Sequence, residues 1–103
     1  MRILIVDDEP LVGRSCCRIL RAHEVDLAET AEEGIALHRA RPYELAFVDL
    51  NLADGVSGLE CAHLLVKVCP LRVVLITGDA GIARAPFEVL CKPFSASELA
   101  ACV

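Results

Sequence analysis

Carboxylates, a hydroxyl and an ammonium group each follow a short apolar run of the sequence. They belong to Asp7, Asp8, Asp49, Thr77 and Lys92. Clustered carboxylates suit a hard cation such as Mg²⁺, which takes oxygen ligands, and a carboxylate nucleophile can accept a phosphoryl group as an acyl phosphate. An ammonium and a hydroxyl would stabilise the remaining phosphoryl oxygens. If these side chains converge, they predict metal-assisted phosphoryl transfer to a carboxylate.

Each of these residues also has a simpler interpretation. The acidic run Asp7-Asp8-Glu9 before Pro10 could have no role beyond capping a helix and placing negative charge at the positive end of the helix dipole. Asp49 could open a turn, Thr77 could bond its own backbone, and Lys92 could be a plain surface residue. Residues that cap independently need not all follow apolar runs, so the conjunction favours one shared site.

The apolar runs that precede these residues are predicted to be strands. They are apolar at successive positions, which indicates strands covered on both faces, as in a parallel sheet. In such a sheet, the loops after the carboxyl ends of the strands form the ligand crevice. The predicted strands cover residues 3–6, 25–28, 45–48, 73–76 and 89–91, and the second is the weakest.

Helical patterns lie between these strands. The first helix is predicted from Pro10 to Ala22, with an apolar stripe along it. Two capping boxes predict the starts of the second and last helices, and the third is expected near Gly58. Twelve residues separate Ile76 from Val89, which leaves room for only a reduced fourth helix. The stripe is Leu11, Val12, Cys16, Ile19 and Leu20, and the boxes are Thr30 with Glu33 and Ser95 with Glu98.

The composition limits the class of protein. A chain of 103 residues fits one domain, predicted to span residues 1–103, and the alternation of strands and helices predicts an α/β fold. The net charge of −5 argues against binding nucleic acid or an anionic membrane through bulk charge. The six cysteines form no CxxC pair, which argues against a disulfide scaffold or a zinc site. With no signal-peptide pattern and no long apolar run, we expect a cytoplasmic protein.

Four motifs stand at the predicted strand ends: Ile3-Leu4-Ile5-Val6-Asp7-Asp8-Glu9, Phe47-Val48-Asp49-Leu50-Asn51-Leu52, Leu75-Ile76-Thr77-Gly78 and Cys91-Lys92-Pro93-Phe94. In this order, the sequence resembles a response-regulator receiver domain of two-component signalling over essentially the whole chain. The resemblance implies a doubly wound, flavodoxin-like α/β fold. It has a five-stranded parallel sheet in the order 2-1-3-4-5, here with a reduced fourth helix and a short fifth.

The resemblance also implies roles for residues at the strand ends. By position, Asp49 is the phosphoacceptor of a phosphorelay. The expected Mg²⁺ site consists of Asp8 as a direct ligand, Asp7 acting mainly through water, Asp49, and the main-chain carbonyl of Asn51. Thr77 corresponds to a switch hydroxyl that moves toward the phosphoryl group.

Lys92 corresponds to the cation that pairs with the acceptor and then with its phosphate. It is held in the family by a cis Lys92-Pro93 bond, which is a minority state in general. Asn51 and Asp79 occupy positions that influence phosphate loss in receivers.

The resemblance further implies the partners. The phosphoryl donor is a phosphohistidine on a sensor histidine kinase or a histidine phosphotransfer protein, while the output partner is not indicated and a homodimer is left open. Such a domain is not an enzyme beyond self-catalysed phosphotransfer and dephosphorylation. A phosphohydrolase is disfavoured because Asn51 stands where such enzymes carry a second acid.

The sequence departs from the family pattern in three places, and the first two of these departures favour an alternative. Val89 stands where many receivers carry an aromatic residue, and Phe87 is two residues out of register. The stretch from Thr77 to Lys92 is short, and the loop after Asn51 resembles that of receivers attached to hybrid kinases. The alternative is an interaction module that acts largely independently of phosphorylation. His23, His38 and His63 are expected to be surface or boundary residues rather than ligands.

Overall fold

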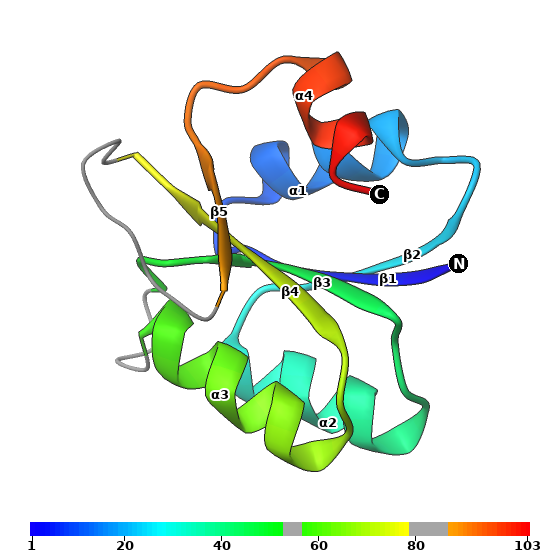
Figure 1. Cartoon of the computed structure of the whole chain (residues 1–103), viewed down its shortest axis with the longest axis vertical. Coiled ribbons are helices and arrows are strands. Elements are labelled where there is room, and N and C mark those ends of the chain that lie inside the picture. Colours follow the sequence, from blue (N-terminus) through cyan, green and yellow to red (C-terminus); the bar gives the residue numbers. More distant parts are fainter. Residues whose placement is uncertain (53–56, 79–86) are drawn as a thin grey trace.

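The computed structural model describes residues 1–52, 57–78 and 87–103. It contains a five-stranded parallel sheet in the order β2-β1-β3-β4-β5 (Figure 1), which confirms the predicted fold and strand order. The strands are β1 (Arg2–Val6), β2 (Glu24–Ala28), β3 (Leu45–Asp49), β4 (Arg72–Thr77) and β5 (Glu88–Cys91).

Burial follows the position of each strand in the sheet. The central strand β3 is buried along its whole length, and β4 is buried from Val73 onward. At one edge, β2 alternates between exposed and partly buried residues up to its last residue, the buried Ala28, which explains why its apolar run is weak in the sequence. At the other edge, β5 is only partly buried.

The helices form two layers, one on each face of the sheet. In Figure 1, α1 and α4 cover one face, while α2 and α3 cover the other. Ile5 and Phe47 belong to the core under α1 and α4, and Leu4 and Val48 belong to the core under α2 and α3. Each face of the sheet thus buries its own set of apolar side chains. The helices are α1 (Pro10–Ile19), α2 (Ala31–Ala40), α3 (Gly58–Val68) and α4 (Ala96–Ala101).

Side-chain caps start three of these helices. The hydroxyl groups of Thr30, Ser57 and Ser95 each accept a hydrogen bond from the backbone N–H three residues further on. Ser95 and Glu98 form the reciprocal capping box that the sequence predicts. This box starts α4, whose six residues confirm the prediction of a short final helix.

The first helix is shorter than predicted. It ends at Ile19 rather than at Ala22, because Leu20 turns into the core, where it is 2% exposed, and the chain then bends toward β2. The amide of His23 donates to the carbonyl of Leu20 in this bend. Leu11, which the predicted apolar stripe includes, is 76% exposed, so the packed stripe begins at Val12.

The prediction that His38 is a surface or boundary residue is wrong, because its side chain is fully buried. Its Nε2 lies 2.8 Å from the carbonyl of Cys69, and its Nδ1 accepts a hydrogen bond of 3.0 Å from the amide of Tyr43. An amide can only donate, so Nδ1 is the acceptor and Nε2 the donor. Both ring nitrogens have backbone partners, which is how a buried histidine is accommodated.

Several expectations concern parts of the chain that receive no structural description. The reduced fourth helix, Asp79, and the part of the loop at residues 53–56 lie outside the described residues. All six cysteines are free. Among the described helices, none combines the length and the apolar character needed to cross a membrane.

Candidate functional site

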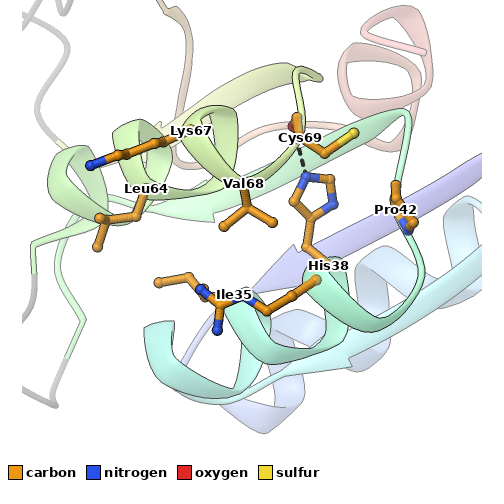
Figure 2. A pocket seen from close by; sticks show the side chains of 8 residues that line it. Ile35, His38, Pro42, Leu64, Lys67, Val68 and Cys69 are labelled. Carbon is orange, nitrogen blue, oxygen red and sulfur yellow. Dashed lines mark hydrogen bonds between the residues drawn. The ribbon is translucent and has the colours of Figure 1, made fainter.

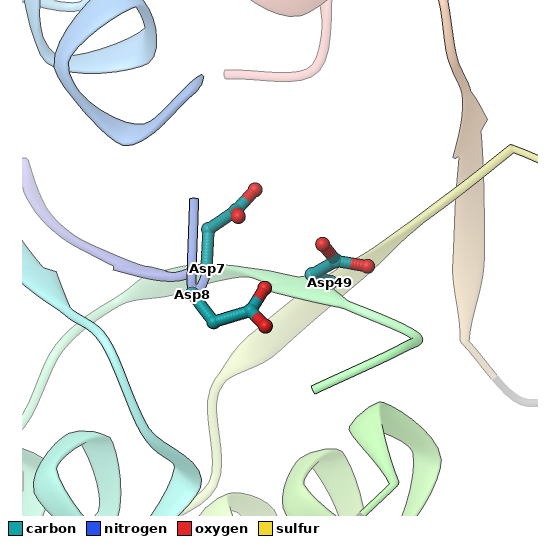
Figure 3. A group of neighbouring side chains, drawn as sticks. All are labelled: Asp7, Asp8 and Asp49. Carbon is teal, nitrogen blue, oxygen red and sulfur yellow. The ribbon is translucent and has the colours of Figure 1, made fainter. Parts of the chain in front are cut away.

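The carboxyl ends of the strands bring three aspartates together. Asp7 and Asp8 follow β1, and Asp49 is the last residue of β3, which pairs with β1 in parallel. One carboxylate oxygen from each of the three lies within 4.8 Å of the others (Figure 3). The predicted convergence of these side chains is therefore present.

Asp7 is the most buried member of this carboxylate cluster. Its Oδ1 accepts a hydrogen bond of 2.8 Å from the amide of Glu9, and its Oδ2 is buried without a hydrogen-bond partner. Burial raises the pKa of Asp7, while the hydrogen bond from the Glu9 amide opposes that shift. An anionic oxygen without a hydrogen bond is costly to bury, so it marks a place that a cation would occupy favourably.

The Asp49 carboxylate, like that of Asp7, accepts a hydrogen bond from the amide two residues further on, and it lies closer to the ammonium group of Lys92 than Asp7 does. Its Oδ1 accepts a hydrogen bond of 3.0 Å from the amide of Asn51, and its Oδ2 lies 3.3 Å from Nζ of Lys92. The same Nζ lies 3.9 Å from Oδ2 of Asp7. Each buried carboxylate thus uses one oxygen to bind the amide two residues on and directs the other toward Lys92.

Lys92 reaches the cluster from the end of β5. Its amide donates to the carbonyl of Thr77 at 2.7 Å, and the bond to Pro93 is cis, as the family resemblance implies. Burial lowers the pKa of Lys92, but the charges of Asp49 and Asp7 outweigh this effect and raise its pKa overall. The ammonium group therefore stays charged beside the two carboxylates.

Thr77 and Asn51 complete the predicted set of site residues. Thr77 is the last residue of β4 and is 2% exposed. Asp49 pairs with Ile76 in the sheet, so Thr77 lies one residue beyond that pair at the same edge. Asn51 is exposed, and its amide is the group that binds Asp49. The ligand role of its carbonyl stays a prediction.

The capping part of the simpler interpretation of the acidic run does not fit the geometry at the start of α1. Glu9 is the N-cap residue of α1, but its side chain makes no capping hydrogen bond. The Asp7 carboxylate binds the amide of Glu9, which precedes the helix, and otherwise faces Lys92. The run therefore contributes to the cluster rather than capping α1. Burial raises the pKa of the Cys16 thiol on α1 to about 11, so this thiol stays protonated near neutral pH.

Gly58 is a positioning residue that the sequence pattern did not reveal. A Cβ atom at Gly58 would lie 2.2 Å from the carbonyl oxygen of Asp49 and 2.5 Å from Cα of Leu50. The amide of Gly58 donates to the carbonyl of Leu50 at 2.9 Å. Only glycine fits there, so the start of α3 is packed directly on the main chain of Asp49. A glycine directly after a helix-capping serine was the available signal.

A hollow of about 480 Å³ lies beside Lys92. Leu11 and Ser15 of α1 form one side, and Pro93 and Phe94 form the other. The exposed Leu11 gives this hollow an apolar rim next to the ammonium group. The cluster is thus bordered by a surface on which another molecule could rest.

A doubly wound sheet with carboxylates and a lysine at its carboxyl edge defines the receiver class of signalling domains. The chain belongs to the response regulator receiver domain family, whose sequence model matches residues 3–103. It is 36% identical over 106 residues to the photosynthetic apparatus regulatory protein RegA of Cereibacter sphaeroides, covering 94% of this chain and 57% of that protein. The chain spans less than three fifths of the length of such curated relatives.

Solved structures show the same fold. The receiver domain of NtrX from Brucella abortus has a TM-score of 0.87 and 31% identity, with 97% of this chain and 92% of that chain covered. A response regulator from Burkholderia pseudomallei, solved with a phosphorylated aspartic acid, a calcium ion and citrate, has a TM-score of 0.86 and 28% identity. That match covers 97% of this chain and 64% of the other.

Proposed function

We propose that this domain accepts a phosphoryl group on Asp49 with Mg²⁺ bound beside it, and that phosphorylation switches binding to an output partner. The donor is a phosphohistidine on a sensor histidine kinase or a histidine phosphotransfer protein. The main support is the contact of 3.3 Å between Lys92 Nζ and Asp49 Oδ2, within a cluster of three carboxylates. The phosphorylated aspartic acid of the Burkholderia pseudomallei regulator is consistent with this proposal.

In this proposal, the residues that hold Mg²⁺ are Asp7, Asp8, Asp49 and, through its carbonyl, Asn51. The donor set fits a hard divalent cation, since all four groups offer oxygen, and the buried Oδ2 of Asp7 has no hydrogen bond to lose. When bound, Mg²⁺ supplies positive charge that offsets the carboxylates and the oxygens of the incoming phosphoryl group. Asp8 would contact it directly and Asp7 mainly through water.

Asp49 is the nucleophile. One of its carboxylate oxygens forms a bond to phosphorus as the bond between phosphorus and the imidazole nitrogen of the donor breaks. The imidazole keeps the electron pair of that bond and takes up a proton. The amide of Asn51 holds the carboxylate in place, and Lys92, whose pKa is raised by its acidic neighbours, stabilises the phosphoryl oxygens.

Phosphorylation adds negative charge at a site that is already acidic. We expect the phosphoryl group to draw Lys92 and the hydroxyl of Thr77 toward it and to shift an existing conformational equilibrium. The two residues are linked by the hydrogen bond from the Lys92 amide to the Thr77 carbonyl. A rearrangement at either residue therefore displaces the main chain at the ends of both β4 and β5.

The hollow beside Lys92 is the proposed contact surface for the donor protein. It borders the ammonium group and has exposed Leu11 at its rim, so an apolar side chain of the donor can rest there while its phosphohistidine approaches Asp49. We place this exchange in the cytoplasm, where free cysteines persist. Residues 1–103 would act there as a single receiver domain.

The decisive experiment is labelling by the small phosphodonor acetyl phosphate. With Mg²⁺, the wild-type chain should gain one phosphoryl group, measured by intact mass, and chelation of the metal should prevent the gain. Asp49→Asn should abolish the labelling because the amide is not a nucleophile. Glu44→Gln, a matched change at an exposed carboxylate that directly precedes β3 and so lies at the opposite edge of the sheet, should leave it intact. Undiminished labelling of Asp49→Asn would exclude Asp49 as the acceptor.

A second candidate function is partner binding that does not depend on phosphate. It is favoured by Val89, which packs partly buried against the core under α2 and α3 and has no aromatic ring to reorient when Thr77 moves. The two functions differ in one measurement. Beryllofluoride with Mg²⁺ mimics the phosphoryl group, and equal partner affinity with and without it would support the second function.

A further inference from the structure

The face formed by α2 and α3 carries a groove that the phosphoacceptor site does not use. The groove has a volume of about 710 Å³ near the ends of the two helices. A second hollow of about 320 Å³ shares Ile35, Arg39 and Leu64 with it, so the two form one continuous surface, here called the α2–α3 groove. Figure 2 shows the larger hollow, with Ile35 of α2 and Leu64 of α3 among the residues that line it.

The side chains of α2 along this groove follow an ordered pattern, with an exposed charged residue on either side of the partly buried Ile35. Glu32 lies in the first turn, the apolar Ile35 lies at the middle, and Arg39 lies in the last turn. Their spacing of three and four residues places them on one side of the helix. The stripe is therefore acidic at its start, apolar at its centre and basic at its end.

Helix α3 repeats this order of residues over the same total length. Glu60 lies in the first turn, Leu64 is 38% exposed at the middle, and Lys67 lies in the last turn. On both helices, seven residues separate the acidic and basic ends, or about 10 Å along the axis. Both helices connect parallel strands on the same face of the sheet, so they run in the same direction and their acidic ends lie side by side.

The charged ends have no ion-pair partner among the residues of the domain that the structure describes. Of the residues that the structure describes, no carboxylate or basic group forms a salt bridge with Glu32, Arg39, Glu60 or Lys67. The apolar centre is likewise open, since Leu64 is one of the exposed large apolar residues. The face thus has an apolar strip with acidic residues at one end and basic residues at the other. The strip is open to a partner, and the charged residues form no salt bridge with the described part of the domain.

We propose that the α2–α3 groove binds a second copy of this chain. A two-fold axis lying in the interface, at right angles to both helices and level with Leu64, makes the helices of the two copies antiparallel. Leu64 then faces its own equivalent, Glu60 faces Lys67 of the partner subunit, and Glu32 faces Arg39 of the partner subunit. The two-fold operation thus places each charged end opposite its complement, as an isologous interface requires.

The size of this surface sets the strength of the association. Two short helices from each copy give a contact at the low end of the range for specific interfaces. Exposed ion pairs are individually weak, so four of them together change the dissociation constant by roughly fourfold to a thousandfold. The dimer is therefore concentration-dependent and weakens as salt screens the charged ends.

A charge-reversal experiment tests this arrangement by sedimentation velocity. An acidic variant carries Arg39→Glu and Lys67→Glu, and a basic variant carries Glu32→Arg and Glu60→Lys. Each alone should dimerise at least roughly tenfold more weakly than wild type, because like charges now face each other. An equimolar mixture of the two should restore the dimer, since the opposite charges face each other again.

The matched control places the same charge change on the other face of the sheet. Arg14→Glu with Arg18→Glu alters two exposed arginines of α1 and should leave the wild-type dimer unchanged. Circular dichroism and labelling by acetyl phosphate verify that each variant is folded. A wild-type chain that stays monomeric up to about 1 mM, a mixture that fails to associate, or equal weakening by the α1 control would each overturn the proposal.

Discussion

The ammonium nitrogen of Lys92 lies 3.3 Å from Oδ2 of Asp49, and among the basic groups of residues 1–52, 57–78 and 87–103 this is the closest ion pair with the carboxylate cluster. One ammonium cannot balance three carboxylates, and the buried Asp7 keeps an oxygen without a hydrogen bond. The folded domain therefore holds excess negative charge at this edge. Such a site gains free energy from a divalent cation and loses it when the cation is removed.

The first prediction concerns Asp7. Asp7→Asn should stabilise the metal-free protein by about 1 to 3 kcal/mol, because it removes a buried charge whose Oδ2 has no hydrogen bond. Urea unfolding in the presence of a chelator measures this change. In wild type, added Mg²⁺ should raise the midpoint by mass action, and Asp7→Asn should reduce that shift. A destabilised variant without metal would contradict this account of the site.

The second prediction concerns Lys92. Lys92→Met should destabilise the metal-free protein by about 1 to 3 kcal/mol, less than for a fully buried pair because Lys92 is 27% exposed. It should also slow phosphorylation by acetyl phosphate. The matched control is Lys67→Met, which removes an exposed lysine and should change the unfolding free energy by less than about 0.5 kcal/mol at low protein concentration. Equal effects of the two substitutions would mean that the Asp49 contact contributes nothing.

The third prediction concerns Gly58. Gly58→Ala forces a Cβ atom against backbone atoms of Asp49 and Leu50 and should cost about 2 to 4 kcal/mol, together with slower phosphorylation of Asp49. Gly13→Ala is the control, since its Cβ would meet only the side chain of Leu27, which can move. Thermal unfolding compares the two. A smaller cost at Gly58 than at Gly13 would show that the start of α3 is not fixed against the acceptor.

The fourth prediction concerns pH and Tyr43, at the opposite edge of the sheet. Tyr43 is 3% exposed and its hydroxyl donates to Asp26 at 2.5 Å; burial, reinforced by this bond, raises its pKa to about 12. The folded state therefore keeps the phenol proton more tightly than the unfolded state does. The stabilisation is complete below pH 10 and is lost as the pH rises toward 12, to a total of about 2 to 3 kcal/mol.

Tyr43 is the only tyrosine of the chain, so phenolate absorbance follows its titration directly. Tyr43→Phe should remove this part of the pH dependence while leaving phosphorylation unchanged. If the wild type and Tyr43→Phe lose stability in parallel between pH 10 and 12, the hydrogen bond to Asp26 does not favour the folded state.

The fold could be predicted because each strand and helix is encoded by residues that lie close together in the sequence. Strand β3 is apolar at successive positions and is buried on both faces, and Ser95 with Glu98 encodes the start of α4 within four residues. The strand ends then place Asp7, Asp49 and Lys92 at one edge, as expected. These features depend on residue type and spacing alone.

The features that sequence reasoning missed depend on contacts between distant segments. His38 is polar by type, yet the carbonyl of Cys69 and the amide of Tyr43 satisfy its ring, and neither partner is evident from spacing. The end of α1 depends on Leu20 turning into the core, which a helical pattern does not reveal. Gly58 has its role only because the main chain of Asp49 passes beside it.

Because Gly58 is the first residue of α3 and rests on the main chain of Asp49, the helix is seated on the acceptor itself. If that main chain moves, the start of a helix of eleven residues, about 16 Å long, has to move with it. Tilting moves the distal end of a rod further than its seat. Lys67 lies near the distal end of α3. A tilt of α3 would therefore move the charge of Lys67, at one edge of the sheet, in response to a change at Asp49 at the other edge.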